Sequence, residues 1–265
     1  MLNDATFQRF SAWMKQTTGV DLPPCKKPLV QQRLHKRLNA RNVPTLEAYY
    51  RLLMEPCEEA ERTLAIDLLT THETYFFREP KHFDWLKQRL SQWPRSEPFK
   101  LWSAAASSGE EVWSLAMQLA NQLGLDGAWQ LLGSDISPVA LEKAARAHYS
   151  TQRSEGIPQE FLRRYCLKGT GQHQGTLLIE RELRGRVEFR QINLDQALPA
   201  IGPFNIVFLR NVLIYFNPQT KQSVVERVLT RIVPGGWLVV SHSESLHGLQ
   251  LPLVLEAPGI YRKTS

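Results

Sequence analysis

Two adjacent carboxylates at the end of a run of small residues are the first candidates for chemistry in this sequence. Glu110 and Glu111 close the segment Leu101-Trp-Ser-Ala-Ala-Ala-Ser-Ser-Gly-Glu-Glu111, and an amphipathic run follows. This pattern is typical of a chain that leaves a buried strand, turns tightly and begins a helix over the end of a sheet. Small residues let the backbone approach a ligand, and paired acids repel a phosphate. The segment therefore predicts a loop for a cationic nucleoside, although either acid alone also suits the first turn of a helix.

A further acid lies 24 residues after Glu111, where a second apolar run ends. Asp135 follows Leu131-Leu-Gly-Ser, so it marks the expected end of a strand. An acid at that position can accept both ribose hydroxyls of a nucleoside that lies across the strand ends. The alternative is that Asp135 caps the helix beginning near Pro138, a role for which Ser137 competes. Beside the two-glutamate loop, ribose binding is the favoured interpretation.

The segment Thr70-Thr-His-Glu-Thr-Tyr-Phe-Phe-Arg78 is a second constellation, in which aromatic residues and an arginine follow a polar turn. Arg78 has the planar fork of donors that neutralises a carboxylate. The alternative is an aromatic core stripe, with Arg78 paired to Glu79 or to solvent.

A third constellation is Phe208-Leu-Arg-Asn-Val-Leu-Ile-Tyr-Phe216. Arg210 and Asn211 end an apolar strand, which is where parallel sheets contact their ligands. Tyr215 follows one helical turn later, either presenting its hydroxyl to the same crevice or packing in the core. The later segment Ser241-His-Ser-Glu244 contains His242, which we interpret as a core or supporting histidine, because neither a serine-hydrolase nor a zinc-protease motif occurs.

The elements that position these residues show two different patterns of apolar residues along the chain. Apolar residues recur at three- and four-residue spacing through the first 70 residues, which predicts helices, and residues 1–75 are expected to form a helical N-terminal domain. Residues 76–265 then alternate short apolar strands with helical patterns, which predicts a parallel, doubly wound sheet with helices on both faces. The expected strands are 99–103, 129–134, 187–192, 204–209 and 236–241, with a turn at 234–236, and the expected helices are 110–123, 138–147 and 218–233.

Residues 150–184 interrupt this rhythm and are expected to be an inserted β-subdomain. Two short apolar runs flank a loop containing Gly169, Gly171 and Gly175, a pattern that predicts a β-hairpin. Small sheets with open edges can dock an extended peptide.

Composition excludes several classes of protein. The chain has 265 residues, 43% of them apolar, without a membrane-length apolar run or a signal peptide, so we expect a cytoplasmic protein. Its three cysteines are far apart, which argues against a disulfide framework or a sequence-local metal site. The net charge of +6 and the pI near 9.3 make nucleic acid conceivable, but the bases lack interleaved aromatic residues.

The charge is unevenly distributed. Residues 26–41 hold six bases and no acid, whereas residues 42–80 hold eight acids and three bases. Arg33, Arg37 and Arg41 form one stripe of a predicted helix, with Lys36 nearby. We expect either an acidic partner for this stripe or a merely solvated face.

Taken together, the sequence resembles the chemotaxis receptor glutamate methyltransferases of the CheR type along nearly its whole length. Two positions depart from the family: His72 stands where Asn is usual, and Val112-Trp113 replace Pro-Tyr. The resemblance rests on five strings in the family's order, namely Thr-His-Glu-Thr-Tyr-Phe-Phe-Arg78, Trp102-Ser-Ala-Ala-Ala-Ser-Ser-Gly-Glu-Glu111, Ser134-Asp-Ile-Ser137, Ile192-Asn-Leu194 and Leu209-Arg-Asn-Val-Leu-Ile-Tyr-Phe216.

The resemblance implies a Rossmann-like methyltransferase domain after a small all-helical domain. It also implies S-adenosylmethionine as methyl donor, S-adenosylhomocysteine as product and no metal. Catalytic roles would fall to Arg78 and Tyr215. Donor-binding roles would fall to His72, Thr74, Arg78, Glu111, Asp135, Asn193, Leu194, Arg210 and Asn211.

The implied partner is the cytoplasmic domain of a chemoreceptor, served by a monomer recruited to receptor arrays, with no nucleic acid and no membrane insertion. Arg33, Lys36, Arg37 and Arg41 would meet the receptor's methylation helices. Gly169, Gly171 and Gly175 resemble the loop of members that bind a receptor's C-terminal peptide tail. The alternatives are a methyltransferase with another acceptor and a non-catalytic module that binds the donor.

Overall fold

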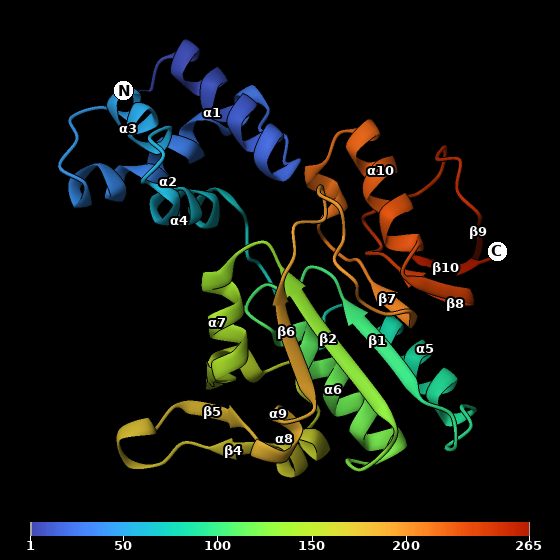
Figure 1. Cartoon of the computed structure of the whole chain (residues 1–265). Coiled ribbons are helices and arrows are strands. Elements are labelled where there is room, and N and C mark those ends of the chain that lie inside the picture. The colour runs from blue at the N-terminus through green and yellow to red at the C-terminus, as the bar shows by residue number, and fades with distance from the viewer. Residues whose placement is uncertain (1, 265) are drawn as a thin grey trace.

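The computed structural model describes residues 2–264, which form a helical unit beside a sheet domain (Figure 1). The helical unit has its own core, in which Phe10, Met14, Leu34, Tyr49 and Leu53 are fully buried. It consists of α1 (Asp4–Thr18), α2 (Lys27–Ala40), α3 (Leu46–Leu53) and α4 (Glu59–Leu69), with the 3₁₀ turn η1 (Pro24–Lys26) before α2.

The main sheet places five parallel strands side by side in the order β6-β2-β1-β7-β8. Successive side chains of a strand point to opposite faces. Leu101 therefore packs on one face of the sheet against α6 (Glu110–Leu123). Trp102 packs on the opposite face against α10 (Pro218–Leu229). These elements are β1 (Phe99–Ser103), β2 (Trp129–Asp135), β6 (Val187–Gln191), β7 (Phe204–Phe208) and β8 (Ile232–Val239), with α5 (Pro80–Ser91), α6 (Glu110–Leu123), α7 (Pro138–Arg146) and α10 (Pro218–Leu229).

Two features of the sheet differ from the sequence-based expectation. Strand β8 begins at Ile232, because Pro234 and Gly235 are accommodated by a register shift against β7 instead of ending the pairing. The sheet is also mixed, since β10 (Ile260–Lys263) runs antiparallel to β8 and to β9 (Leu253–Ala257). No helix separates these last strands, so the alternation of strands and helices that predicted a parallel sheet does not extend to them.

The inserted subdomain is a small antiparallel sheet with the order β3-β5-β4. The expected hairpin is confirmed as β4 (Cys166–Lys168) and β5 (Thr176–Ile179), and β3 (His148–Ser150) pairs with the other side of β5. A Cβ atom at Gly169 would lie 1.9 Å from the carbonyl oxygen of His173, so the loop requires glycine there. Three short helical segments, η2 (Thr151–Ser154), α8 (Gln159–Tyr165) and η3 (Gly171–His173), and then α9 (Arg181–Arg184), complete the region.

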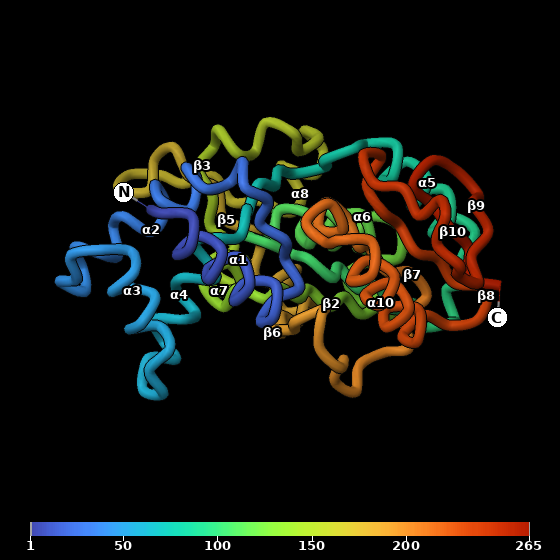
Figure 2. The backbone as a smooth tube through the Cα atoms, turned by 90° about the horizontal axis from the view of Figure 1, so that it is seen from above, coloured from blue at the N-terminus to red at the C-terminus, as the bar shows by residue number. Residues whose placement is uncertain are grey.

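The helical unit reaches the sheet domain at the carboxyl ends of the strands. Figures 1 and 2 show the end of α1 approaching the start of α10. There Val20 forms an isolated antiparallel bridge with Phe216, which follows the 3₁₀ turn η4 (Leu213–Tyr215). Within residues 2–264, none of the helices combines the length and hydropathy needed to cross a membrane.

Candidate functional site

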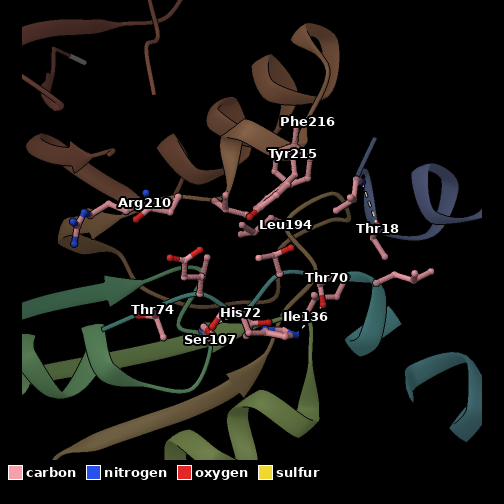
Figure 3. Close-up of a pocket in the computed structure, with 18 of the residues that line it drawn as sticks. Thr18, Thr70, His72, Thr74, Ser107, Ile136, Leu194, Arg210, Tyr215 and Phe216 are labelled. Atoms are coloured by element: carbon pink, nitrogen blue, oxygen red, sulfur yellow. Dashed lines mark hydrogen bonds between the residues drawn. The ribbon is translucent and has the colours of Figure 1, made fainter. Parts of the chain in front are cut away.

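A pocket lies over the carboxyl ends of β1, β2 and β7, where the sequence placed its candidate ligand-binding residues (Figure 3). Parallel strands bring the loops that follow them to one edge of the sheet. All ten residues assigned to donor binding or catalysis contribute to the lining: His72, Thr74, Arg78, Glu111, Asp135, Asn193, Leu194, Arg210, Asn211 and Tyr215.

Asp135 is held at the end of β2 by backbone donors. Its Oδ2 accepts the Ser107 N–H at 2.8 Å, and its Oδ1 accepts the Ser137 N–H at 3.0 Å. Burial raises the pKa of Asp135. Because a carboxylate oxygen has more than one lone pair, each oxygen can accept a further bond from a ligand hydroxyl. Ser107 supports this geometry in a left-handed backbone conformation with φ of 48°, a strain found mostly at functional sites.

The paired glutamates have different surroundings. Glu111 lines the pocket, where its oxygens accept Ser103 Oγ and Arg210 Nη1, each at 2.8 Å. Glu110 is fully buried and bonds to Ser108 Oγ and Arg153 Nη1 outside the pocket. Of the two glutamates, Glu111 is therefore the one that faces a ligand in the pocket.

Arg210 organises the wall behind Glu111. Its side chain is fully buried, and Nη2 donates to the Arg78 carbonyl oxygen at 2.6 Å and lies 3.3 Å from Glu79 Oε2. One guanidinium thus stands between two carboxylates, which leaves a net charge of −1 among Glu79, Glu111 and Arg210. That residual charge favours a cationic ligand in the pocket.

His72 faces Asp67, a residue at the end of α4 that sequence analysis missed. His72 Nε2 lies 2.9 Å from Thr70 Oγ1 and 3.2 Å from Asp67 Oδ1. Burial alone would lower the pKa of His72, but Asp67 and Asp135 raise it overall. Asp67 also accepts the hydroxyl of Ser137, which caps α7. Asp67 sits inside an apolar run, so only its spatial neighbours reveal this role.

Arg78 and Tyr215 lie at the pocket rim. Arg78 Nη1 donates to the Glu73 carbonyl at 2.9 Å, and its guanidinium lies over the Tyr75 ring at 5.4 Å. The alternative pairing with Glu79 does not occur. Tyr215 belongs to a 3₁₀ turn, and its ring extends into the pocket in Figure 3.

The pocket wall opposite the sheet comes from the N-terminal unit, which sequence analysis did not connect to the site. Asp21 N–H donates to the Tyr215 carbonyl at 2.8 Å, and Asn193 Nδ2 donates to the Thr17 carbonyl at 2.8 Å. No local motif signals this wall, because its members are ordinary turn and helix residues. They are Thr18, Val20, Asp21, Leu22, Lys26 and Leu29.

Asn211 is fixed by the segment that follows β8. It has φ of 59°, and its N–H donates to Glu244 Oε2 at 2.9 Å. Glu244 also accepts the Leu213 N–H at 2.7 Å, so this buried carboxylate shapes the turn after β7. His242 is one-third exposed, which rules out the core alternative, and it lies beside Glu79.

The basic stripe of α2 is partly neutralised within the chain, because two of its members pair with acids instead of standing free. Arg37 donates two hydrogen bonds to the buried Glu61, at 2.8 and 2.7 Å. Arg41 is bound to Glu58 and Glu61. Arg33 donates to the Leu68 and Thr70 carbonyls, and Lys36 is exposed. Part of the acid excess of residues 42–80 therefore pairs with this stripe within the same chain.

Two family models match this chain consecutively. Residues 5–70 match the CheR methyltransferase all-alpha domain, and residues 72–256 match the CheR methyltransferase SAM-binding domain. The chain belongs to the CheR methyltransferase family. It is 36% identical to the chemotaxis protein methyltransferase of Escherichia coli K12 over 98% of this chain and 91% of the relative. It is 37% identical to chemotaxis protein methyltransferase 2 of Pseudomonas aeruginosa over 90% and 86%, respectively.

The residues of the CheR pocket fit S-adenosylmethionine, which this family binds. Asp135 has spare acceptor capacity for ribose hydroxyls, and Glu111 carries a charge suited to the donor's ammonium group. Ile136, Ile192 and Leu194 give the pocket an apolar part for the adenine ring. The ribose, the adenine ring and the ammonium group of the donor thus each find a complement in the pocket.

Proposed function

We propose that this chain transfers methyl groups from S-adenosylmethionine to glutamate side chains of a bacterial chemoreceptor, giving glutamate methyl esters. The observation that carries the proposal is the convergence of Asp135, Glu111 and Tyr215 on one pocket at the strand ends. The relatives named as chemotaxis protein methyltransferases support the choice of acceptor.

The proposed reaction requires alignment more than acid–base chemistry. When bound, S-adenosylmethionine would supply an electrophilic methyl group, whose bond to sulfur breaks as the carboxylate oxygen attacks, so that S-adenosylhomocysteine leaves. A receptor glutamate has a pKa of about 4.3 and is ionised at pH 7, so no general base is needed. Asp135 and Glu111 hold the donor, while Arg78 and Tyr215 orient the acceptor carboxylate at the rim. Positioning of this kind can contribute roughly 7–11 kcal/mol. The transfer step as proposed uses no metal.

We further propose that the inserted sheet docks a receptor's C-terminal peptide. Strand β4 is an edge of this sheet, and Leu167 on it is 46% exposed. A peptide that adds a strand there would form backbone hydrogen bonds with β4. Such a tether would raise the local enzyme concentration near the methylation helices to about the millimolar range.

The decisive experiment is transfer of labelled methyl from S-adenosylmethionine to a purified receptor cytoplasmic fragment. We expect base-labile label on glutamate, because methyl esters hydrolyse in alkali. Label that resists base, or donor binding without any transfer, would refute the glutamate acceptor.

The tether is tested by removing the receptor's last residues. We expect weaker binding and slower methylation at low enzyme concentration, with recovery at high concentration because only the local concentration is lost. A matched Leu167→Glu variant should lose the same advantage on the intact receptor. Unchanged binding after tail removal would exclude the tether.

A further inference from the structure

Behind the pocket wall, Glu79, His82 and His242 bring three potential metal-ligating atoms together. The Nδ1 atoms of His82 and His242 each lie 3.4 Å from Glu79 Oε2. All three atoms lie within 4.8 Å of one another. Glu79 and His82 begin α5, and His242 follows β8. None of the three lines the donor pocket.

The buried His82 ring has an unpartnered nitrogen aimed into this cluster. The residue is fully buried, and its Nδ1 finds no hydrogen-bond partner within residues 2–264. Nε2 lies 3.4 Å from the Pro258 carbonyl oxygen, which can only accept, so the tautomer that makes this hydrogen bond has its proton on Nε2 and a lone pair on Nδ1. A Cβ atom at Gly259 would lie 3.0 Å from Nε2, which shows how closely the backbone fits the ring on that side.

Each neutral tautomer of His82 without a cation leaves a conflict. With the proton on Nε2, the Nδ1 lone pair faces the Glu79 carboxylate. With the proton on Nδ1, the other lone pair faces the Pro258 carbonyl. A doubly protonated ring would satisfy both contacts, and like a metal ion it would bring positive charge near Arg210, which lies 3.3 Å from the same Glu79 oxygen. A metal ion between Nδ1 and Oε2 removes the conflict and keeps the Nε2 hydrogen bond, which is the usual support for a ligating histidine.

We propose that Glu79, His82 and His242 form a binding site for a divalent transition-metal ion of the Zn²⁺ class. Tetrahedral ligands at bond lengths of 2.0–2.1 Å are separated by about 3.3 Å. The two observed separations of 3.4 Å from Glu79 Oε2 match that value. Two histidines and one carboxylate are a three-ligand set for zinc, which leaves a fourth position for water.

The local charge and hydrogen bonding are compatible with such an ion. Glu79 Oε2 also lies 3.3 Å from Arg210 Nη2, so a metal ion would share this carboxylate with the guanidinium, whose other carboxylate partner is Glu111. The second oxygen of Glu79, Oε1, accepts Ser241 Oγ at 2.6 Å, and Oε2 accepts the backbone N–H of His242 at 3.1 Å, so both bonds orient the carboxylate and the metal would use a further lone pair of Oε2. Glu79 itself is held with φ of 59°, so the backbone commits it to this position.

The test is titration of the full-length, metal-free protein with Co²⁺, followed by competition with Zn²⁺ in calorimetry. We expect one strong equivalent with the visible absorption of a tetrahedral Co²⁺ centre. His242→Gln should weaken Zn²⁺ binding by roughly 10–100-fold. Because His242 is at the surface, this variant should remain folded, which unchanged binding of S-adenosylhomocysteine would verify. His82→Gln should have the larger effect if it folds.

Two control variants exclude ordinary surface binding. His173→Gln alters an exposed histidine near His148, and Cys57→Ser alters an exposed cluster with Glu55 and Glu58. Both should retain the strong equivalent and its spectrum. Equal Zn²⁺ affinity in wild type and His242→Gln, or loss of the strong equivalent in Cys57→Ser, would overturn the proposal.

Discussion

The α2–α4 face and the strand-end pocket are both assembled from acids and arginines, but they use them in opposite ways. On the α2–α4 face, Arg37 and Arg41 surround Glu61, whose carboxylate also accepts the Tyr49 hydroxyl at 2.6 Å. In the pocket, one arginine serves two carboxylates, and Asp135 is held only by backbone donors. The first region satisfies its charges internally and stabilises a fold, whereas the second leaves acceptor capacity for a ligand.

The largest expected effect comes from removing Asp135, the pocket acid with spare hydrogen-bond acceptor capacity. Asp135→Ala deletes two hydrogen bonds from a charged group, each worth about 1.5–3 kcal/mol, so affinity for S-adenosylhomocysteine should fall roughly 1000-fold. Calorimetry measures this loss, and Asp126→Ala, at an exposed acid, is the matched control. Retained affinity in Asp135→Ala would remove the ribose-binding role.

Glu61→Gln should destabilise the α2–α4 face, in which the charges are paired with one another. Removing one partner of a buried ion pair typically costs about 3 kcal/mol or more. We expect a clear loss of Tm and of unfolding free energy, with donor affinity little changed in the folded protein. The exposed Glu47→Gln provides a control. If Glu61→Gln has the Tm of the wild type, the ion pairs of Arg37 and Arg41 with Glu61 do not contribute to the stability of the fold.

The same carboxylate predicts acid sensitivity of the N-terminal unit. Burial alone would raise the pKa of Glu61, but hydrogen bonds from Arg37, Tyr49 and Arg41 lower it from 4.5 to about 2. A depressed folded-state pKa stabilises the fold above the unfolded value and loses that contribution as pH falls. Stability should therefore decline between about pH 4.5 and pH 2. Denaturant titrations should show a shallower decline over this range in Glu61→Gln than in wild type.

Tyr215→Phe separates orientation of the acceptor from binding of the donor. Loss of one hydroxyl contact at the reacting carboxylate should lower kcat roughly tenfold, corresponding to about 1.4 kcal/mol. S-adenosylhomocysteine affinity should stay nearly constant, because Asp135 and Glu111 are untouched. Turnover at the wild-type rate would exclude this role for Tyr215.

The smallest effect is expected on the exposed part of α2. Lys36→Glu should lower receptor methylation by roughly 2–5-fold at low salt and leave Tm unchanged, because exposed charges steer partners weakly and are screened. Arg37→Glu should instead lower Tm through repulsion of Glu61. If Lys36→Glu leaves methylation at its wild-type rate, Lys36 has no part in receptor recognition.

Much of the fold could be predicted from local pattern. The bounds of β1 and α6 agree with the expected ones, because an apolar strand, a small-residue turn and an amphipathic helix are all local signals. The C-terminal strands β9 and β10 were not predicted, since their pairing with β8 depends on the position of the sheet edge. The pairing of Arg37 and Arg41 with Glu58 and Glu61 was not predicted, because the charge pattern showed a basic and an acidic stretch but not that they pack against each other.

The sequence by itself determined the chemistry of the pocket: Asp135, Glu111, Arg210 and Tyr215 stand at the ends of predictable strands, and parallel strands deliver their loops to one edge. Only the tertiary structure decided which charges remain available. It placed Asp67 beside His72 and the turn after α1 over the pocket. It also joined His82 to His242, which lie 160 positions apart. The physical reason is that periodicity and strand order are local properties, whereas the partner of a charge depends on which distant surfaces pack together.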